Sequence, residues 1–467
     1  MSVTTPAEAA RRELGDGFGA GLIGPDDGSY DEARALFNAM IDRRPALIAR
    51  CASADDVART IAFAREHDLP LAVRGGGHNG GGLGSVDDGV VADLSALRSV
   101  SVDPATRTVR VGGGCTWAEV DAATYPHGLS VPCGVISTTG VGGLTLGGGM
   151  GHLTRAHGLT IDNLLAAEVV LADGERVRAS ADEEPDLFWA LRGGGGNFGV
   201  VTEFTFRAAA VSDVVGGPTF WPIEQTEEVL RAYREFLPTL PNHASGFFCF
   251  HRVPPGPPFP EEIHLRQVCG IVWCIDASDE EAERLMAPML AVGEPLMHGA
   301  GRVPLPGLNS AFDPVYAPGD QWYWRADFVD EIPDESVARN QDWATRMPTW
   351  KSGSHIYPID GAAHDVGPTD TPWAYRDTQF AQVIIGVDTE PASAPALRDW
   401  TVGYWESLHP YSAGGAYVNF MMDEGDARVR ATYGANYDRL AQVKAEYDPD
   451  NVFRVNQNIR PAGQSSG

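Results

Sequence analysis

Three glycine-rich segments carry the residue types best suited to binding a large phosphate-bearing ligand. They are LPLAVRGGGHNGGG at 69–82, STTGVGGLTLGGGMGHL at 137–153 and LRGGGGNFGVVTEF at 191–204. Glycines that follow a strand leave backbone N–H groups free to cradle phosphates and let the backbone approach a ligand closely. One such segment could be only a tight turn of a glycine-rich sheet, but three together indicate a backbone that wraps a large planar ligand.

The residues around these glycines disfavour other common folds with glycine-rich motifs. A Rossmann fold needs a helix after the turn and an acidic residue about 20 positions further on, whereas here another strand-like run, GVVADL, follows. The motif GxxxxGK[ST] is absent from the sequence, and GxSxG occurs only as GQSSG at 463–467, with no strand-like run before it. The absence of the first motif argues against a P-loop nucleotidase, and the lack of a strand before the second argues against the nucleophile turn of an α/β-hydrolase.

The six cysteines are scattered along the chain and indicate neither a disulfide framework nor a metal site. Cys269 and Cys274 share the strand-like run QVCGIVWCI, but their odd offset places them on opposite faces of a strand. We therefore expect buried apolar thiols and no bound metal.

The spacing of apolar residues divides the chain into segments of different character. Residues 46–208 alternate short strands with short helices, including a helix capped by Ser53 and a hairpin that turns at Asp173 and Gly174. After about residue 211 the strands are longer and aromatic, with amphipathic helices between them, which is typical of an antiparallel sheet with helices on one face. We expect an α+β fold in four parts: 1–39, 40–210, 211–410 and 411–467.

Length and charge narrow the range of partners. A chain of 467 residues is too long for one ordinary core, and its net charge of −28 disfavours binding to nucleic acid. Neither an apolar stretch of about 18 residues nor a signal peptide is visible, so we expect a cytoplasmic protein without a membrane partner. The sequence leaves the oligomeric state open.

The glycine segments, together with the ending YDPDNVFRVNQNI, resemble one family of flavoproteins. The resemblance is to the berberine-bridge-enzyme-like branch of the vanillyl-alcohol oxidase / p-cresol methylhydroxylase (PCMH-type FAD-binding) superfamily, in its monocovalent bacterial form. It covers about residues 40 to 460. It implies FAD as the cofactor and a two-part FAD-binding domain, formed by 40–210 and 411–467, with an α+β substrate domain between the two parts.

The resemblance implies that His78, in RGGGHNGGG, attaches covalently to the 8α-methyl group of the flavin. A histidine is more often a structural hydrogen-bonding residue, but glycines on both sides would let this ring pack against a flavin. Relatives with a second, cysteinyl link carry C-x-x-x-G-x-G-G, which would place the cysteine where this chain has Ile136. Cys133 lies seven residues before Gly140, so we expect a single link at His78 and a small loop residue at Cys133.

Further contacts with FAD are expected from the glycine motifs and the C-terminal ending. By the resemblance, Thr139 lies at the flavin edge that O₂ must reach, and its small side chain favours an oxidase over a dehydrogenase. The other residues expected to bind FAD are Arg74, Gly75, Gly76, Gly77, Asn79, Gly140, Gly142, Gly143, Gly149, Gly151, His152, Val201, Asn419, Asn456 and Asn458.

A general base is also expected, because hydride leaves a substrate only if a hydroxyl or amine proton leaves too. Tyr417 in GGAYVNF matches the family's Tyr-x-Asn motif, and the resemblance makes it the base, on a strand where it shares a face with Asn419. A core tyrosine is the alternative. His355 in KSGSHIYPI could take the same role, and Gln382 in QFAQVII completes the expected catalytic set.

The aromatic middle region suits a flat or sugar-like substrate, although these side chains could equally form the core of the domain. The expected substrate contacts are Tyr323, Arg325, Tyr357 and Tyr375. The leading interpretation is an FAD-dependent oxidase that takes hydride from a C–H bond next to O or N of a small organic molecule, with O₂ as acceptor and H₂O₂ as product. The substrate would be a secondary metabolite or, as second choice, a carbohydrate. A flavin-dependent oxygenase and a non-catalytic flavin-binding protein are the alternatives.

Overall fold

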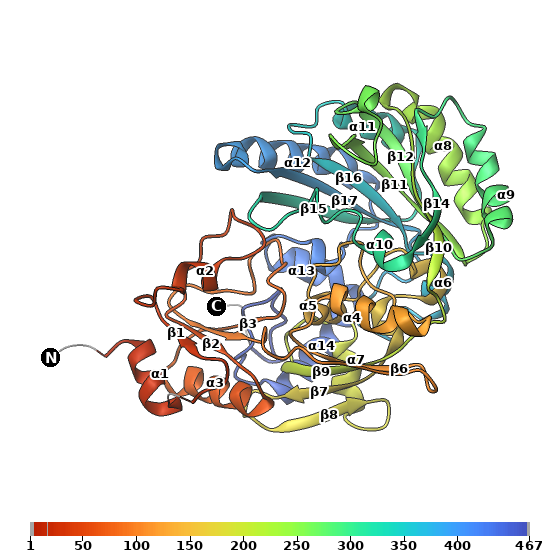
Figure 1. Ribbon diagram of the computed structural model, residues 1–467. Helices are drawn as coiled ribbons and strands as arrows, with labels where there is room; N and C mark the ends of the chain where they lie inside the picture. Colours follow the sequence, from red (N-terminus) through yellow and green to blue (C-terminus); the bar gives the residue numbers. More distant parts are fainter. Residues whose placement is uncertain (1–3, 16, 465–467) are drawn as a thin grey trace.

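Three β-sheets organise the protein in the computed structural model, which describes residues 4–15 and 17–464. Two of the sheets lie in the lower body of Figure 1, together with the N-terminal helices. The third and largest sheet forms the upper body with the helices that cover it. The arrangement confirms the predicted α+β fold with an antiparallel sheet.

The first sheet holds the strand that leads into the first glycine segment. Its strands, in order across the sheet, are β1 (Leu22–Ile23), β2 (Leu47–Arg50), β4 (Val90–Asp93) and β3 (Leu71–Arg74). Strand β4 pairs in parallel with both β2 and β3, and helix α3 (Ala54–Glu66) connects those two. The side chain of Ser53 caps this helix by accepting a hydrogen bond from the Asp56 N–H, as predicted.

The second sheet is antiparallel, and its central strand follows the third glycine segment. Its strands, in order, are β5 (Val100–Asp103), β6 (Thr108–Gly112), β9 (Val200–Arg207), β7 (Leu164–Val170) and β8 (Arg176–Ser180). The predicted hairpin at Asp173 and Gly174 joins β7 to β8, and Gly174 has a φ of +88°. The other helices of this body are α1 (Pro6–Leu14), α2 (Tyr30–Arg34), α4 (Trp117–Thr124), α5 (Val141–Leu146), α6 (Thr154–His157) and α7 (Pro185–Leu191).

The large sheet presents one face to helices and the other to the lower body (Figure 1). Its strands, in order, are β13 (Met297–His298), β10 (Asp213–Pro222), β12 (Gln267–Ile275), β11 (Ala244–Arg252), β16 (Gly353–Pro358), β17 (Phe380–Asp388) and β15 (Gln321–Val329), with β14 (Gly301–Pro304) also on β10. Cys269 and Cys274 on β12 lie in separate apolar cores on the two faces, as their spacing predicted.

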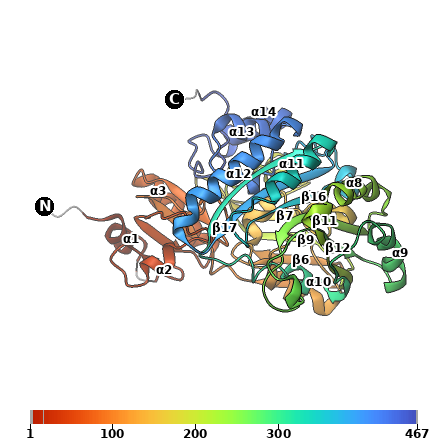
Figure 2. The ribbon, with the colours of Figure 1, turned by 90° about the horizontal axis from the view of Figure 1, so that it is seen from above.

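Four helices cover the outer face of the large sheet. They are α8 (Thr226–Phe236), α9 (Asp279–Leu290), α11 (Asp334–Ala344) and α12 (Ala394–Leu408). Figure 2 shows α11 and α12 crossing over the strands. The short helix α10 (Leu305–Asn309) instead packs near β10 and β14, and the inner face of the sheet is left to line a cavity.

The C-terminal segment returns to the lower body through α13 (Asp426–Tyr433) and α14 (Tyr437–Tyr447) (Figure 1). Lys444 is fully buried, and its Nζ donates hydrogen bonds to the Asn197 carbonyl and to Asp448 Oδ2, each at 2.6 Å. Asn197 belongs to the third glycine segment. A buried ion pair therefore ties the end of the chain to a turn almost 250 residues earlier.

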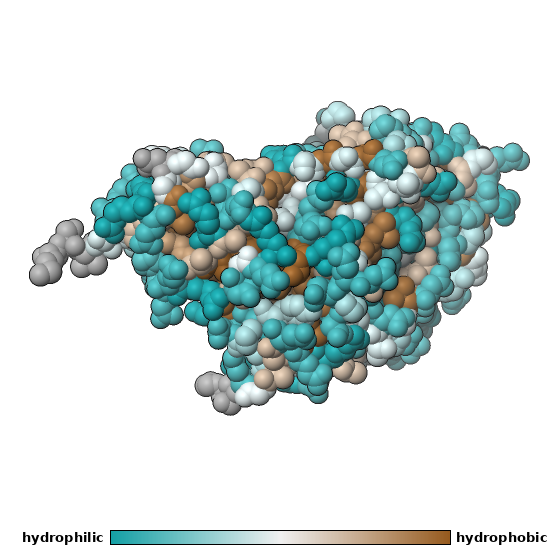
Figure 3. Space-filling model, turned by 90° about the horizontal axis from the view of Figure 1, so that it is seen from below, coloured by the Kyte–Doolittle hydropathy of each residue, from teal (hydrophilic) through white to brown (hydrophobic). Residues whose placement is uncertain are grey.

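The surface of the protein is largely polar on the face drawn in Figure 3. Figure 3 shows a face covered mainly by hydrophilic residues, with hydrophobic ones in small separate patches near its middle. All six cysteines are buried with free thiols. Among residues 4–15 and 17–464, no helix is both long and apolar enough to cross a membrane.

Replacing Lys444 by methionine should destabilise the fold strongly. The substitution leaves Asp448 buried without its cationic partner, which costs about 3–5 kcal/mol in comparable sites. Urea unfolding would measure the change in the free energy of unfolding. The matched control is Arg460→Gln, which removes the exposed pair with Asp426 in the same segment and should cost less than about 1 kcal/mol. Equal effects of the two variants would contradict the anchoring role of Lys444.

Candidate functional site

A cavity of about 270 Å³ lies between the glycine segments and the inner face of the large sheet. All three glycine segments contribute to its wall, through Gly75–Gly77, through Gly140, Gly142 and Gly143, and through Gly195–Asn197. Strands β15, β16 and β17 contribute side chains on the opposite side. The cavity therefore lies between the two bodies of the protein and is lined by segments that are far apart in the sequence.

The first two glycine segments touch each other through their backbones. A Cβ atom on Gly76 would lie 2.6 Å from the Gly140 nitrogen, so no side chain fits between them. Gly143, at the start of α5, has open space where a Cβ would stand, and it lines the cavity. Backbone without side chains thus forms a wall that a planar ligand can approach closely.

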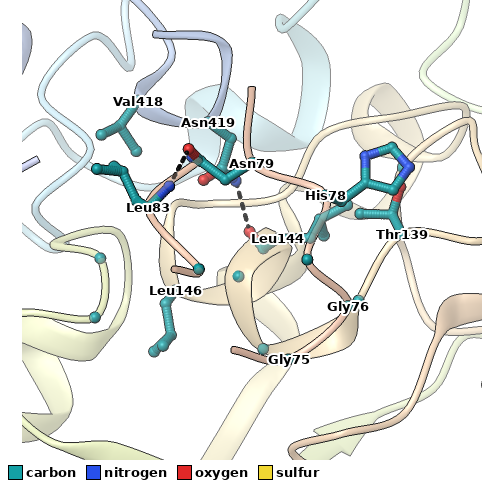
Figure 4. Close-up of a pocket in the computed structure, with 18 of the residues that line it drawn as sticks. Gly75, Gly76, His78, Asn79, Leu83, Thr139, Leu144, Leu146, Val418 and Asn419 are labelled. Carbon is teal, nitrogen blue, oxygen red and sulfur yellow. Dashed lines mark hydrogen bonds between the residues drawn. The ribbon is translucent and has the colours of Figure 1, made fainter. Parts of the chain in front are cut away.

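His78 reaches this cavity from the first glycine segment. In Figure 4 its ring lies beside Thr139, whereas Asn79 and Asn419 lie together on the other side of the view. The ring stacks on Phe37 with centroids 3.6 Å apart, and Nε2 is 3.5 Å from Thr138 Oγ1. Burial lowers the pKa of His78 to about 4, so the imidazole is neutral at neutral pH and keeps the lone pair that a nucleophile needs.

Cys133 is placed very differently. It is buried, lies outside the cavity wall, and its Sγ is 3.5 Å from the side-chain nitrogen of Asn309. Burial, and after it the charge of Asp121, raises the pKa of the thiol well above its usual range. A protonated, enclosed thiol is a poor nucleophile.

Six aromatic side chains form a closed ring at the roof of the cavity, which we call the aromatic cage. Neighbouring centroids around this ring are between 5.2 and 6.5 Å apart. The members, in order around the ring, are Tyr316, Trp322, Trp324, Phe420, Tyr357 and His355, and all of them line the cavity. Such an arrangement suits a flat ring placed among them.

Several polar atoms of the cavity wall lack partners in the protein. The hydroxyl of Tyr316 and the indole N–H groups of Trp322 and Trp324 are buried and have no hydrogen-bond partner among the described residues. The Tyr433 hydroxyl, near the third glycine segment, is in the same state. Buried polar groups are normally paired, so these atoms indicate a ligand that supplies hydrogen-bond acceptors.

Tyr417 and Asn419 meet at the cavity, although not on a strand as predicted. Tyr417 precedes a turn of 3-10 helix at Val418–Phe420, which pairs with no sheet. The Tyr417 hydroxyl accepts hydrogen bonds from the Gly149 N–H at 3.0 Å and from Asn419 Nδ2 at 2.7 Å. Burial raises its pKa to about 12. At neutral pH Tyr417 is therefore protonated. Its O–H is free to donate one hydrogen bond to a ligand.

His355 sits in a buried chain of hydrogen bonds. Its Nδ1 is 2.6 Å from the Tyr357 hydroxyl, and its Nε2 is 2.6 Å from Nε2 of His251. Tyr357 and His355 line the cavity, and His251 lies behind them on β11. Sequence reasoning missed His251, because a lone histidine at the end of the apolar run GFFCFHR carries no signal of its partner.

The structure places most of the residues predicted to bind cofactor or substrate, or to act in catalysis, in the cavity wall. The predicted residues that line it are Arg74, Gly75, Gly76, Gly77, His78, Asn79, Thr139, Gly140, Gly142, Gly143, Val201, Tyr357, His355, Tyr417, Asn419 and Asn456. Those outside the wall are Gly149, Gly151, His152, Asn458, Tyr323, Arg325, Tyr375 and Gln382. Gly149 still contributes indirectly, through its bond to Tyr417.

Three of the predicted side chains lie outside the cavity because successive residues of a strand point to opposite faces of the sheet. Tyr323 and Arg325 alternate with the two tryptophans of β15, so they lie on the opposite face from the cage. Gln382 likewise alternates with Val383 on β17, and its side chain bonds Asn340 and Ser354 instead. Both faces of this sheet are buried, and for that reason apolar patterning could not reveal which face carries the site.

Comparison with known families identifies two matching segments. The family described as "FAD binding domain" matches residues 45–180, and the family "Berberine and berberine like" matches residues 416–460. These segments contain the first two glycine segments and the Tyr417–Asn419 turn. The match supports FAD as the ligand of the cavity.

Full-length relatives agree with this. An uncharacterized FAD-linked oxidoreductase of Bacillus subtilis is 31% identical over 95% of this chain and 97% of its own length. (R)-6-hydroxynicotine oxidase of Paenarthrobacter nicotinovorans is 30% identical over 95% of this chain and 97% of its own length. The crystal structure of 6-hydroxy-D-nicotine oxidase from Arthrobacter nicotinovorans superposes with a TM-score of 0.83 at 26% identity, over 95% of this chain and 98% of that one.

Adding a methyl group at Gly143 should weaken FAD binding without unfolding the protein. The new Cβ would enter the cavity, and overpacking of this kind costs about 1–3 kcal/mol, or roughly 5- to 150-fold in affinity. Titration of FAD into the Gly143→Ala protein, with His78 also replaced by alanine to exclude any covalent bond, measures this. Gly307→Ala in α10, where a Cβ also meets open space, is the control and should leave the affinity unchanged. An unchanged affinity of the Gly143 variant for FAD would contradict the expectation that FAD lies against this part of the cavity wall.

Proposed function

The chain belongs to the berberine-bridge-enzyme-like family of FAD-linked oxidoreductases, and on this premise we propose that it is an oxidase of small organic molecules. It would take hydride from a C–H bond next to O or N, pass the electrons to O₂ and release H₂O₂. The observation that carries the proposal is one continuous cavity, which joins three glycine segments to the aromatic cage. When bound, FAD supplies the hydride acceptor, and the residues of this chain position the substrate and move its proton.

We propose that FAD is held covalently through His78 alone. Three features support this: the ring lines the cavity, it is neutral, and Phe37 holds it by stacking. Cys133 is enclosed outside the wall with a raised pKa. Segments 40–210 and 411–467 would together form the FAD domain, with 211–410 as the substrate domain. The bond from Lys444 to Asn197 supports that division.

The proposed substrate is a flat, uncharged ring compound of the kind found in secondary metabolism. Among the described residues that line the cavity, the only permanently charged side chain is Arg74, and it is paired with Asp93 at 2.7 Å. The cage offers aromatic faces and unpartnered donors, which suit carbonyl or ring oxygens and nitrogens. A carbohydrate stays the second choice, because tryptophan faces also stack on sugars.

Thr139 supports an oxidase over a dehydrogenase. It lines the cavity beside His78, and its side chain is short (Figure 4). A small residue at this point leaves room for O₂ to approach a bound flavin. An oxygenase is the alternative outcome on the same fold, and the yield of peroxide separates the two.

Anaerobic mixing with ring alcohols and amines tests the proposed function. A substrate should bleach the flavin absorbance, and admission of O₂ should restore it with one H₂O₂ formed per product molecule. A lower peroxide yield, with oxygen found in the product, would favour an oxygenase. The third outcome is that no compound reduces the flavin, and that flavin reduced by light is reoxidised only slowly in air. That result would indicate a flavin-binding protein without oxidase activity.

Acid-denatured protein should stay yellow, because the His78 bond survives unfolding. Peptide mapping should find flavin on the peptide that contains His78, and Cys133→Ser should leave that result unchanged. His78→Ala should fold and bind FAD reversibly, since the glycine segments are intact. Release of all flavin into the acid supernatant of the parent protein, or flavin on the Cys133 peptide, would contradict the proposed attachment.

Tyr417→Phe should slow flavin reduction by less than about tenfold. At neutral pH the Tyr417 hydroxyl is protonated and can give a ligand one hydrogen bond, a contribution of about 1 kcal/mol. The resemblance makes Tyr417 the base instead. In that case only its phenolate could accept a proton, so the parent rate would rise roughly tenfold per pH unit from pH 7 to 10 and the variant would lose about 10²–10⁴ in rate. Stopped-flow reduction across that pH range decides between the two roles.

A further inference from the structure

Tyr357, His355 and His251 form an unbranched hydrogen-bond chain that leads from the cavity into the protein. The exposed fractions of the three residues are 5%, 1% and 6%. Both links of the chain are 2.6 Å long, from Tyr357 Oη to His355 Nδ1 and from His355 Nε2 to His251 Nε2. The chain ends on the cavity side at a hydroxyl of the aromatic cage.

Neighbouring residues hold the chain in place. Phe247 and Phe312 pack on the His355 ring, with centroids at 5.0 and 5.4 Å. Gly353 on β16 makes room for the second imidazole, because a Cβ there would lie 2.7 Å from His251 Cε1. The sequence thus places a glycine two residues before His355, where any side chain would displace His251.

Two placements of the protons are compatible with both hydrogen bonds of this chain. Each placement determines where the Tyr357 hydroxyl donates its own hydrogen bond. Two facing Nε2 atoms need one proton between them, so one ring donates and the other accepts. If His355 donates to His251, its Nδ1 carries the lone pair and accepts from the Tyr357 hydroxyl. If His251 donates, His355 Nδ1 carries the proton and the hydroxyl of Tyr357 must donate into the cavity.

We propose that the first arrangement is the working one, and that Tyr357 takes the substrate proton while His355 takes the proton of Tyr357. This inference rests on the proposed oxidation. The substrate O–H or N–H bond breaks and a new bond forms to Tyr357 Oη, as the original Tyr357 O–H proton moves to His355 Nδ1. The substrate carbon loses hydride to FAD in the same oxidation, so the substrate gives up two electrons and gains a C=O or C=N bond.

His251 is a positioning residue in this scheme. Its Nε2 accepts a hydrogen bond from His355 Nε2–H, which keeps the lone pair of His355 on Nδ1, toward Tyr357, as the aspartate of a serine-protease triad orients its histidine. Burial lowers the pKa of His251 to about 4 and that of His355 well below its usual range, and it raises the pKa of Tyr357. All three groups are therefore neutral before the reaction. His355 keeps one lone pair, which can accept the proton of Tyr357.

Two substitutions at His251 separate positioning from packing. His251→Phe removes the acceptor and should lower the rate of flavin reduction at saturating substrate by about 10²-fold, with little change in substrate affinity. His251→Gln restores an acceptor oxygen and should recover the rate to within about tenfold of the parent. Tyr357→Phe should lose about 10²–10⁴. The control is His364→Phe: this ring bonds the Thr378 carbonyl away from the cavity wall, and the rate should be unchanged.

A second readout does not depend on turnover. The proton shared by His251 and His355 should give a low-field signal in the one-dimensional proton spectrum of the holoenzyme, absent from His251→Phe and kept in the His364 variant. Parent reduction rates in both His251 variants, or in Tyr357→Phe, would overturn the inference while leaving the oxidase proposal intact. A parent protein that no substrate bleaches would instead overturn the oxidase proposal, and the proton route with it.

Discussion

The contact between the backbones of Gly76 and Gly140 is the constraint on which the site depends. The loop after β3 and the turn that begins α5 come so close that a Cβ on either residue would strike the other segment. Their glycines then turn a bare backbone wall toward the large sheet, and that wall is one side of the cavity. Side chains at these positions would fill the space that a planar cofactor needs.

The rest of the fold secures this wall and closes the space above it. Strands β3 and β9 adjoin the first and third glycine segments, and the C-terminal helix holds the third one through Lys444 and Asn197. The inner face of the large sheet supplies most of the aromatic cage. The glycine wall and most of the aromatic cage thus come from separate bodies of the protein, so substitutions in the cage need not disturb the wall.

Much of this site could be predicted from the sequence, because the glycine wall of the cavity is a local pattern. The glycine segments, His78 and the Tyr417–Asn419 turn are short motifs, and the structure brings them to one cavity. The roof depends on strand phase and on pairing between distant strands, which a single sequence does not encode locally. For this reason the sequence predicts Tyr323 and Arg325 where Trp322 and Trp324 lie, and it gives no sign that His251 on β11 is the partner of His355.

A crystal structure of the yellow protein as purified would test the central claim most directly. We expect a flavin ring against the Gly76 and Gly140 backbones, joined to the imidazole of His78, with its free face toward the aromatic cage. The phosphates should lie against the backbone N–H groups of the glycine segments. A flavin bound outside this cavity, or one whose reactive face points away from the cage, would contradict the account.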